Sequence, residues 1–411
     1  MAANTPLPAR AWLVVGLLWA VGLLNYLDRV MITTMRGSLL EAIPMTDAQF
    51  GLLTSVFLLV YAVLSPFAGY LADRFDRSRV IIGSLFLWSL VTWLTAHART
   101  YEQLLMTRAA MGLSEACYLP AALALIADYH RGPTRSLATG LHLSGVMVGA
   151  ALGGVGGWLA EHRGWAYAFD LFGLIGLGYS LVLLFLLRGP PGSAPPASAR
   201  SASATRVRFG EALVSLFRQP AFLVALCFWG LLGLGGWAVT GWMPTYLGEH
   251  FHLGQGSAGL SATAYTNCAG LVGMLVGGAW ADRWSRTNPR ARILVPIIGL
   301  SVAAPAILLA ASTPVLALAL LALVFYGLAR TFVDANMMPI LCLIADPRYR
   351  ATGYGVLNFF GCAAGGVAIY AGGWLRDAHI DISLVFQFGA FAIAGCAVLL
   401  WFIRPRPAAA E

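Results

Sequence analysis

The segment YEQLLMTRAAMGLSEACYLPAALALIAD (residues 101–128) is apolar enough to span a lipid bilayer, yet it contains Arg108 and Glu115. Seven residues at about 100° each return a helix to nearly the same face, so both side chains point the same way, roughly 10 Å apart. A charge at bilayer depth costs about 2.5–3.5 kcal/mol even on insertion scales, and such charges usually line a substrate or proton pathway. We expect this face to point into the protein. A structural ion pair that ties helices together is the alternative.

The rest of the chain shares this apolar character. Hydrophobic residues make up 59% of its 411 residues and charged residues 11%, and the mean hydropathy is +0.75. Apolar runs of about 20 residues are long enough to cross a bilayer as helices. We therefore predict an all-α membrane protein with twelve membrane helices, near residues 11–35, 48–72, 79–97, 101–127, 136–160, 166–187, 220–246, 257–281, 292–312, 314–343, 351–374 and 381–403. The N-terminal MAANTPLPAR has no signal-peptide pattern, so we expect the first span to be retained.

All 26 basic residues are arginines. Most fall in loops on one side of the predicted membrane, whereas Arg36, Arg99, Arg163 and Arg376 fall on the other. This positive-inside asymmetry predicts that both termini are cytoplasmic and that the net charge of +8 reflects topology rather than nucleic-acid binding. The six cysteines all fall inside predicted spans without pairing or metal spacing, so we expect no disulfide, metal or cofactor.

One long hydrophilic connection divides the spans six and six. Residues 188–218 are rich in Pro, Ser, Ala and Arg, and we predict an N-terminal six-helix bundle at 1–187, a cytoplasmic linker at 188–218 and a C-terminal bundle at 219–411. The end of the linker, RVRFGEALVSLFR, is compatible with an amphipathic surface helix, but a solvated linker is the simpler interpretation.

The two halves repeat short motifs at corresponding places. GYLADRFDR at 69–77 is echoed by GAWADRWSR at 278–286, and Gly-Gly-Trp-Leu at 156–159 recurs at 372–375. Because each half holds an even number of spans, both halves enter the membrane in the same direction. Parallel repeats of this kind are a known transporter design, with the substrate site between the halves near the membrane midplane.

These motifs resemble those of a known family. GYLADRFDRSR at 69–79 resembles the loop signature of the major facilitator superfamily, whose two-half, twelve-helix plan covers essentially the whole chain. NYLDR at 25–29, the spacing of Arg108 and Glu115, and WMPTYL at 242–247 are similar to its anion:cation symporter branch. That branch carries sugar acids, phosphates and other organic anions.

A second branch also shares motifs with the chain. Such symporters often have Trp-Phe-Pro at the end of the fourth helix, where this chain has Asp128-Tyr129-His130. That ending, GLSEACYLP before it and NPRAR at 288–292 are similar to Spinster-type lipid transporters. A Spinster-like carrier of lysolipids is therefore the alternative function, and it would require a long apolar strip along the cavity wall.

The resemblance and the charged residues together predict a site for substrate binding and proton coupling. A guanidinium can hold a carboxylate or phosphate with two hydrogen bonds and keeps its charge, which suits Arg29 and Arg108 to anion binding. The predicted substrate-binding residues are Arg29, Tyr61, Arg108, Arg330 and Asn358, and the predicted proton-coupling residues are Asp28 and Glu115. If the anion occupies the arginines, Glu115 loses its counter-charge and takes up a proton more readily, so each ligand favours the other. A helix-end pair is the alternative for Asp28 and Arg29, and an i,i+4 self-pair with Asp334 is the alternative for Arg330.

The loop signature and its copy predict a gate. The resemblance implies that Asp73, Arg74 and Arg77, with Asp282 and Arg283 in the second half, hold a cytoplasmic gate closed. A tight, positively charged loop without a gating role is the alternative.

The chain as a whole is thus predicted to be a monomeric secondary transporter in the inner membrane. It would import an organic anion, a sugar acid or another carboxylate, across the lipid bilayer by proton-coupled symport with alternating access, and we expect no nucleic-acid partner. The sequence contains no Walker motif for nucleotide binding, no metal-ligand or nucleophile spacing typical of an enzyme, and no filter-like repeat typical of a channel. Gly149-Ala150-x-x-Gly153-Gly154 lacks the proline of the drug-antiporter signature, which counts against a drug exporter.

Overall fold

The structure is a computed structural model that describes residues 9–130, 134–189, 209–288, 290–345 and 349–403, without the side chains of residues 66, 68–74, 209 and 351. Within these ranges the chain is helical and contains no strand. The helices, with η1 a short 3-10 turn, are α1 (Ala9–Met31), η1 (Ile32–Thr34), α2 (Arg36–Ala42), α3 (Asp47–Arg74), α4 (Arg77–Thr95), α5 (Tyr101–Glu115), α6 (Tyr118–Tyr129), α7 (Arg135–Leu152), α8 (Gly154–Arg163), α9 (Trp165–Leu186), α10 (Phe209–Phe217), α11 (Pro220–His250), α12 (Gln255–Trp284), α13 (Ala291–Ala310), α14 (Leu316–Ile344), α15 (Arg350–Asp377) and α16 (Ser383–Phe402).

The predicted fold class is confirmed, and the helix ends lie within a few residues of the predicted spans. Within the described residues, eleven spans are long and apolar enough to cross a membrane. Two of them are interrupted helices, α5 with α6 and α7 with α8. The twelfth long helix is α12, whose first half is rich in small and polar residues.

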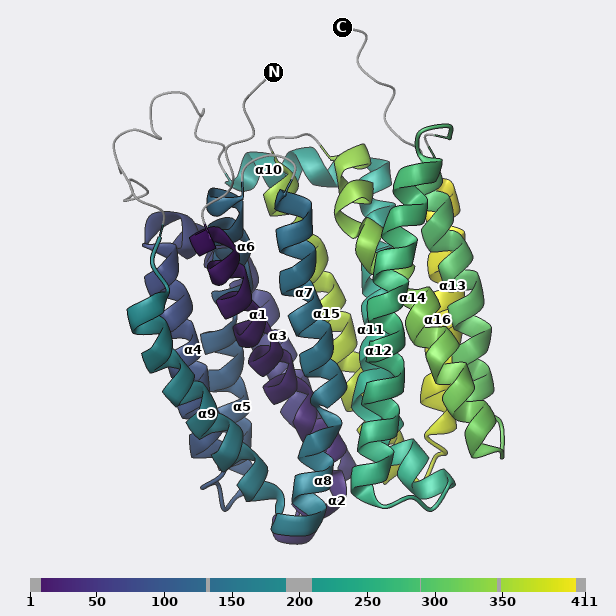
Figure 1. The fold of residues 1–411 in the computed structure, drawn as a ribbon. Coiled ribbons are helices and arrows are strands. Elements are labelled where there is room, and N and C mark those ends of the chain that lie inside the picture. Colours follow the sequence, from purple (N-terminus) through teal and green to yellow (C-terminus); the bar gives the residue numbers. More distant parts are fainter. Residues whose placement is uncertain (1–8, 131–133, 190–208, 289, 346–348, 404–411) are drawn as a thin grey trace, which may run out of the picture.

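The halves repeat the same helix pairings. In the N-terminal half α1 packs on α7, α3 on α5 and α4 on α9; in the C-terminal half α11 packs on α15, α12 on α14 and α13 on α16. Between the halves, α3 packs on α15, and α12 packs on α7 and α8. Figure 1 shows the two bundles side by side, with α10 lying across one end and α2 at the opposite end. We refer to these as the α10 end and the α2 end.

Small residues set how closely α1 and α7 approach. A Cβ added at Gly145 or Gly149 would clash with the backbone carbonyls of Trp19 or Leu23 on α1. The two backbones therefore touch directly, as stripes of small residues allow in membrane bundles. This close contact fixes the position of α1, which carries Asp28 and Arg29.

The end of the linker is helical, in contrast to the simpler interpretation of the sequence. Phe209–Phe217 forms α10, with Ala212 and Leu216 fully buried. These two residues are four positions apart and so lie on one face of the helix, which packs against α11 and α15. Residues 190–208 lie outside the described part of the chain, and the predicted domain boundaries stay a prediction.

Candidate functional site

Four charged side chains are buried inside the N-terminal half. Asp28 and Arg29 come from the last turn of α1, and Arg108 and Glu115 come from α5; none is more than 4% exposed. Removing charges from water is costly unless they meet opposite charges or hydrogen-bond partners. Their mutual contacts therefore decide what this cluster can do.

Arg29 and Glu115 form an ion pair between two helices. Arg29 Nη2 donates to Glu115 Oε2 over 2.8 Å, and Glu115 is the last residue of α5, at the break before α6. Aromatic rings surround the guanidinium, because Arg29 Cζ lies 4.6 Å from the ring centre of Tyr26 and 4.7 Å from that of Tyr61. Such stacking favours a desolvated cation.

Arg108 has a different environment from Arg29. Its Cζ lies 5.0 Å from the ring centre of Phe57, which is also 4.9 Å from Arg29 Cζ. Arg108 Nη1 lies 2.8 Å from Met111 Sδ, a weak acceptor. Among the described residues, no acceptor reaches its Nε or Nη2, and no donor reaches Glu115 Oε1 or Asp28 Oδ1. The cluster thus holds unused donors and unused acceptors within the same half of the protein.

Asp28 is held by a single weak contact among the described groups. Thr92 Oγ1 on α4 donates to Asp28 Oδ2 over 3.4 Å. The carboxyl group is 1% exposed and forms no ion pair with another described residue. It can therefore exchange a proton without first breaking a strong ion pair.

A cavity of about 350 Å³ lies between the two halves. Four of the five residues predicted to bind substrate line it: Arg29, Tyr61, Arg330 and Asn358. Arg108 does not line it, and contacts Phe57 deeper in the N-terminal half. Asn358 also donates to Ser65 Oγ on α3 over 3.2 Å, so this amide joins the halves beside the cavity. The substrate roles themselves stay a prediction.

Arg330 and Asp334 are the charged residues of the C-terminal half that line the cavity. Arg330 Nη1 lies 3.2 Å from Asp334 Oδ2, one turn along α14, with side chains 27% and 22% exposed. The sequence left open whether Arg330 pairs with Asp334 or faces a substrate. In the structure Arg330 pairs with Asp334 and also lines the cavity. A ligand can reach either charge without opening a helix interface.

Aromatic and thioether side chains form much of the cavity wall, and the sequence analysis missed them. Residues of this kind that line the cavity are Tyr26, Met147, Trp229, Trp237, Met274, Tyr326, Met337 and Tyr354. Leu119, Leu143 and Val146 from α6 and α7 make one side apolar. Spacing alone could not separate such residues from core or lipid-facing ones. Tyr26 is the exception, because it lies in the polar interruption of α1 that drew attention to Arg29.

The predicted gate residues are only partly described. The side chains of Asp73 and Arg74 lie outside the described residues. Arg77 pairs with Asp128 at the end of α6, and Asp282 pairs with Arg292 over 3.1 Å. Arg283 is exposed. Both of these ion pairs stay within one half of the protein, and the gating roles stay a prediction.

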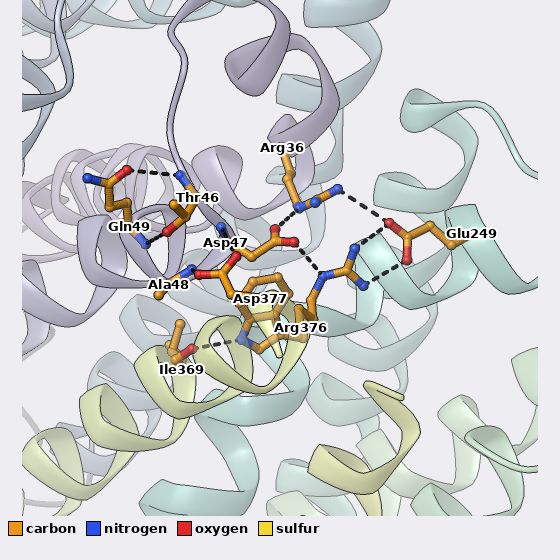
Figure 2. Close-up of polar contacts among 10 residues, drawn as sticks. Arg36, Thr46, Asp47, Ala48, Gln49, Glu249, Ile369, Arg376 and Asp377 are labelled. Atoms are coloured by element: carbon orange, nitrogen blue, oxygen red, sulfur yellow. Dashed lines mark hydrogen bonds and ion pairs between the residues drawn. The ribbon is translucent and has the colours of Figure 1, made fainter. Parts of the chain in front are cut away.

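A charged network that the sequence analysis did not predict joins the halves at the α2 end. Asp47 Oδ1 lies 2.6 Å from Arg36 Nε, and Asp47 Oδ2 lies 3.1 Å from Arg376 Nε. Glu249 accepts from Arg376 through both carboxylate oxygens at 2.7 Å and lies 3.3 Å from Arg36 Nη1. Figure 2 shows these four side chains closing a ring, with Asp377 beside it. The network closes this end of the space between the halves.

Within the described ranges, no three His, Cys, Asp or Glu side chains gather in a way that could hold a metal ion. The polar groups that line the cavity are guanidinium, carboxyl, phenol, indole, amide, hydroxyl and thiol groups. These groups can bind an anion and exchange protons.

Comparisons with known proteins agree with this architecture. A family model described as Major Facilitator Superfamily matches residues 18–369. The chain is 28% identical to an MFS-type efflux pump of Mycolicibacterium smegmatis, over 96% of this chain and 90% of the relative. It is 27% identical to protein spinster homolog 1 of Xenopus laevis, over 84% of this chain and 68% of the relative. A solved bacterial homologue of the human lysosomal transporter Spinster, inward-facing and unoccupied, has a TM-score of 0.76 at 23% identity, over 98% of this chain and 96% of that chain.

Proposed function

This chain belongs to the Major Facilitator Superfamily and is a multi-pass membrane transporter, and from this premise we propose that it couples the uptake of an organic anion to proton entry. The two halves would rock about the cavity and expose it to each side of the membrane in turn. A sugar acid or another carboxylate is the proposed substrate class. The setting we propose is the cell inner membrane, with both termini cytoplasmic and a monomeric protein.

The observation that carries this proposal is the ion pair between Arg29 and Glu115. Arg29 lines the cavity, whereas Glu115 lies behind it, 1% exposed and 2.8 Å from the guanidinium. A substrate carboxylate that enters the cavity competes with Glu115 for the same cation. The buried pair therefore offers an anion site whose occupation changes the charge balance of a neighbouring carboxyl group.

Proton coupling follows from this competition. Once the substrate holds Arg29, Glu115 is a buried carboxylate with a weakened partner, and protonation removes the cost of keeping it charged. Proton binding in turn weakens the hold of Glu115 on Arg29 and favours the substrate. Each ligand then raises the affinity for the other by the same factor, as linkage requires.

Asp28 and Arg108 complete the proposed machinery. Asp28 is the second proton-coupling group, because its carboxyl is buried with a weak contact to Thr92. Arg108 supplies a second fixed positive charge, with two unused donor nitrogens. Its charge would offset that of Asp28 when Asp28 is ionised, and that of Glu115 when Glu115 is ionised and released from Arg29.

A lysolipid is the second candidate substrate, and one observation favours it. The cavity wall is not polar all round, since Leu119, Leu143 and Val146 line one side. Relatives with spinster in their names also match the chain. A lysolipid would place its anionic head at Arg29 and its acyl chain along this apolar side.

Proton flux in proteoliposomes tests the proposal. Liposomes that contain the purified protein and a pH dye are challenged with sugar acids, other carboxylates and lysophospholipids, with wild type and Glu115→Gln compared. We expect one carboxylate class to acidify the lumen with wild type, and Glu115→Gln to abolish the acidification. Acidification by a lysolipid alone replaces the anion proposal with the second candidate. Carboxylate uptake without any proton movement contradicts the coupling.

A further inference from the structure

At the α2 end, the first turn of α3 is capped by an acid from the other half. Asp377, the last residue of α15, accepts from the backbone N–H of Asp47 over 2.8 Å and from that of Ala48 over 3.0 Å (Figure 2). The first N–H groups of a helix have no partner within the helix and carry partial positive charge. A carboxylate there makes charge-assisted hydrogen bonds. Asp377 thus holds the C-terminal half to the N-terminal half.

The first turn of α12 is capped in the reverse direction. Glu161 on α8, in the N-terminal half, accepts from the backbone N–H of Gly256 over 2.8 Å. Gln255, the first residue of α12, exchanges hydrogen bonds with Ser38 on α2: its Oε1 accepts from Ser38 N over 3.0 Å and its Nε2 donates to Ser38 Oγ over 2.9 Å. Here the helix end belongs to the C-terminal half and the acid to the N-terminal half.

The two contacts occupy equivalent places in the internal repeat. Both capped helices, α3 and α12, are the second long helix of their half. Glu161 and Asp377 each follow the tryptophan of a Gly-Gly-Trp-Leu motif by three residues. The motif glycines permit the approach, because a Cβ at Gly373 would clash with the carbonyl oxygen of Asp47, and a Cβ at Gly157 would lie 3.1 Å from that of Gln255.

A hydroxyl group reinforces each contact farther along the capped helix. Ser55 on α3 donates to the carbonyl oxygen of Gly366 on α15 over 2.6 Å. Thr263 on α12 donates to that of Ala151 on α7 over 2.8 Å. Each hydroxyl lies eight residues after the first residue of its helix, Asp47 or Gln255. The repeated contacts therefore extend over about the first two turns of each capped helix, and are not limited to its first residues.

We propose that these two contacts form a duplicated latch that holds the α2 end closed, and that both halves of the latch must release before the cavity opens at that end. The latch consists of Asp377 on the first turn of α3 and Glu161 on the first turn of α12. It goes beyond the proposed function, because it does not depend on which solute the cavity binds.

The two halves of the latch have unequal support. Beside Asp377, the charged network of Arg36, Asp47, Glu249 and Arg376 also joins the halves. Beside Glu161, the neutral amide of Gln255 occupies the position that Asp47 holds in α3. Loss of Glu161 therefore leaves weaker contacts between the halves on its side than loss of Asp377 leaves on the other.

Distances between spin labels at the α2 end test the latch. Labels on Glu41→Cys in the N-terminal half and His252→Cys in the C-terminal half occupy exposed positions, in a background without native cysteines and without substrate. We expect Glu161→Gln to raise the ratio of long to short distances on the order of 10-fold, and Asp377→Asn about 3-fold. If the two contacts act independently, the double variant raises it about 30-fold.

Asp381→Asn is the matched control. Asp381 is an exposed acid at the same end, but it accepts from Ser383 N of its own half over 2.8 Å, so its loss leaves the distances unchanged. If an acid variant does not fold, Ser55→Ala and Thr263→Ala probe the same contacts, and each should shift the distances in the same direction. Unchanged distances in folded variants of both pairs overturn the latch. A double variant that equals the stronger single variant overturns its duplication.

Discussion

The fourth membrane helix of each half carries a charge at its midpoint, but the two charges differ in sign and in partner. Glu115 is the fifteenth of 29 residues in Tyr101–Tyr129, and Arg330 is the fifteenth of 29 in Leu316–Ile344. Glu115 is 1% exposed and pairs with Arg29 on another helix, whereas Arg330 pairs with Asp334 one turn away on its own helix.

The two ion pairs would respond differently to a bound ligand. An ion pair between two helices contributes to their packing, so a ligand that breaks this pair changes how α1 and α5 hold together. A pair within one helix is satisfied locally and leaves the helix arrangement unchanged when a ligand intervenes. Under the proposed function we therefore expect coupling to depend on the N-terminal half and the C-terminal half to tune the cavity. The predictions below test this assignment, from the largest expected effect to the smallest.

Arg29→Ala should have the largest effect. It removes the proposed anion site and leaves Glu115 buried without its partner, which should lower the free energy of unfolding by about 3–5 kcal/mol. Uptake should fall about 100-fold or more, because the substrate loses one buried contact with a charged group. Radiolabelled uptake and thermal unfolding measure both changes. Arg29→Lys is the control and should recover stability better than uptake, because an ammonium lacks the planar fork. An equal loss in Arg330→Ala would remove the distinction between the halves.

Glu115→Gln should change coupling more than binding. The amide keeps the volume and can still accept from Arg29, but it cannot take up a proton. Substrate-driven proton entry should be lost, whereas exchange of labelled for unlabelled substrate should persist at a rate independent of pH between about 5 and 8. A matched Asp334→Asn variant should keep its proton entry. If it loses coupling as completely as Glu115→Gln, coupling is shared between the halves.

Arg330→Ala should have an intermediate effect. Because this pair is about a quarter exposed, its loss costs one charge-assisted contact to the substrate, and we expect the KM for uptake to rise about 10-fold with coupling intact. Asp334→Asn and the double variant complete a mutant cycle. Strong non-additivity identifies the pair as a unit that the substrate meets together. An unchanged KM in all three variants would restrict the pair to a structural role.

Asp128→Asn should have the smallest effect. Its pair with Arg77 at the α10 end is partly exposed, so we expect a loss of about 0.5–1 kcal/mol in the free energy of unfolding, measured by thermal melting. Asp282→Asn removes an ion pair from the second half for comparison. The side chains of Arg292 and Asp282 are 40% and 71% exposed, and this variant should melt like wild type. A larger loss from Asp282→Asn would reverse the expected order of the halves.

The sequence was sufficient to predict the helices but not the partners of their charges. Apolar runs fix where a chain can cross a bilayer, so all twelve spans were predictable. The pair of Arg29 with Glu115 joins residues 86 positions apart, and only the packing of α1 against its neighbours decides it. Helical periodicity predicts that Arg108 and Glu115 share one face of a helix. It gives no information about which residues of different helices are in contact.

The helix breaks and the α2-end contacts were also missed. Both breaks carry a sequence signal that the apolar runs masked: Pro120 has no N–H to bond the carbonyl of Ala116 four residues earlier, and the second break falls at the Gly153-Gly154 pair. The residues of the charged network look individually like ordinary helix-end charges. A usable signal did exist for the latch: the repeated Gly-Gly-Trp-Leu motif is followed in both halves by an acid, Glu161 or Asp377.

The duplicated latch also bears on how such a chain could have arisen. Each half carries one capped helix end and one capping acid, and each presents both to the other half. That is the reciprocal geometry of a two-fold interface between identical subunits, in which the same patch on each copy contacts its counterpart. A six-helix ancestor with one helix end and one acid would already close against a second copy of itself. Gene duplication and fusion would then preserve a working interface, and the charged network around Asp47 would be a later addition to one side.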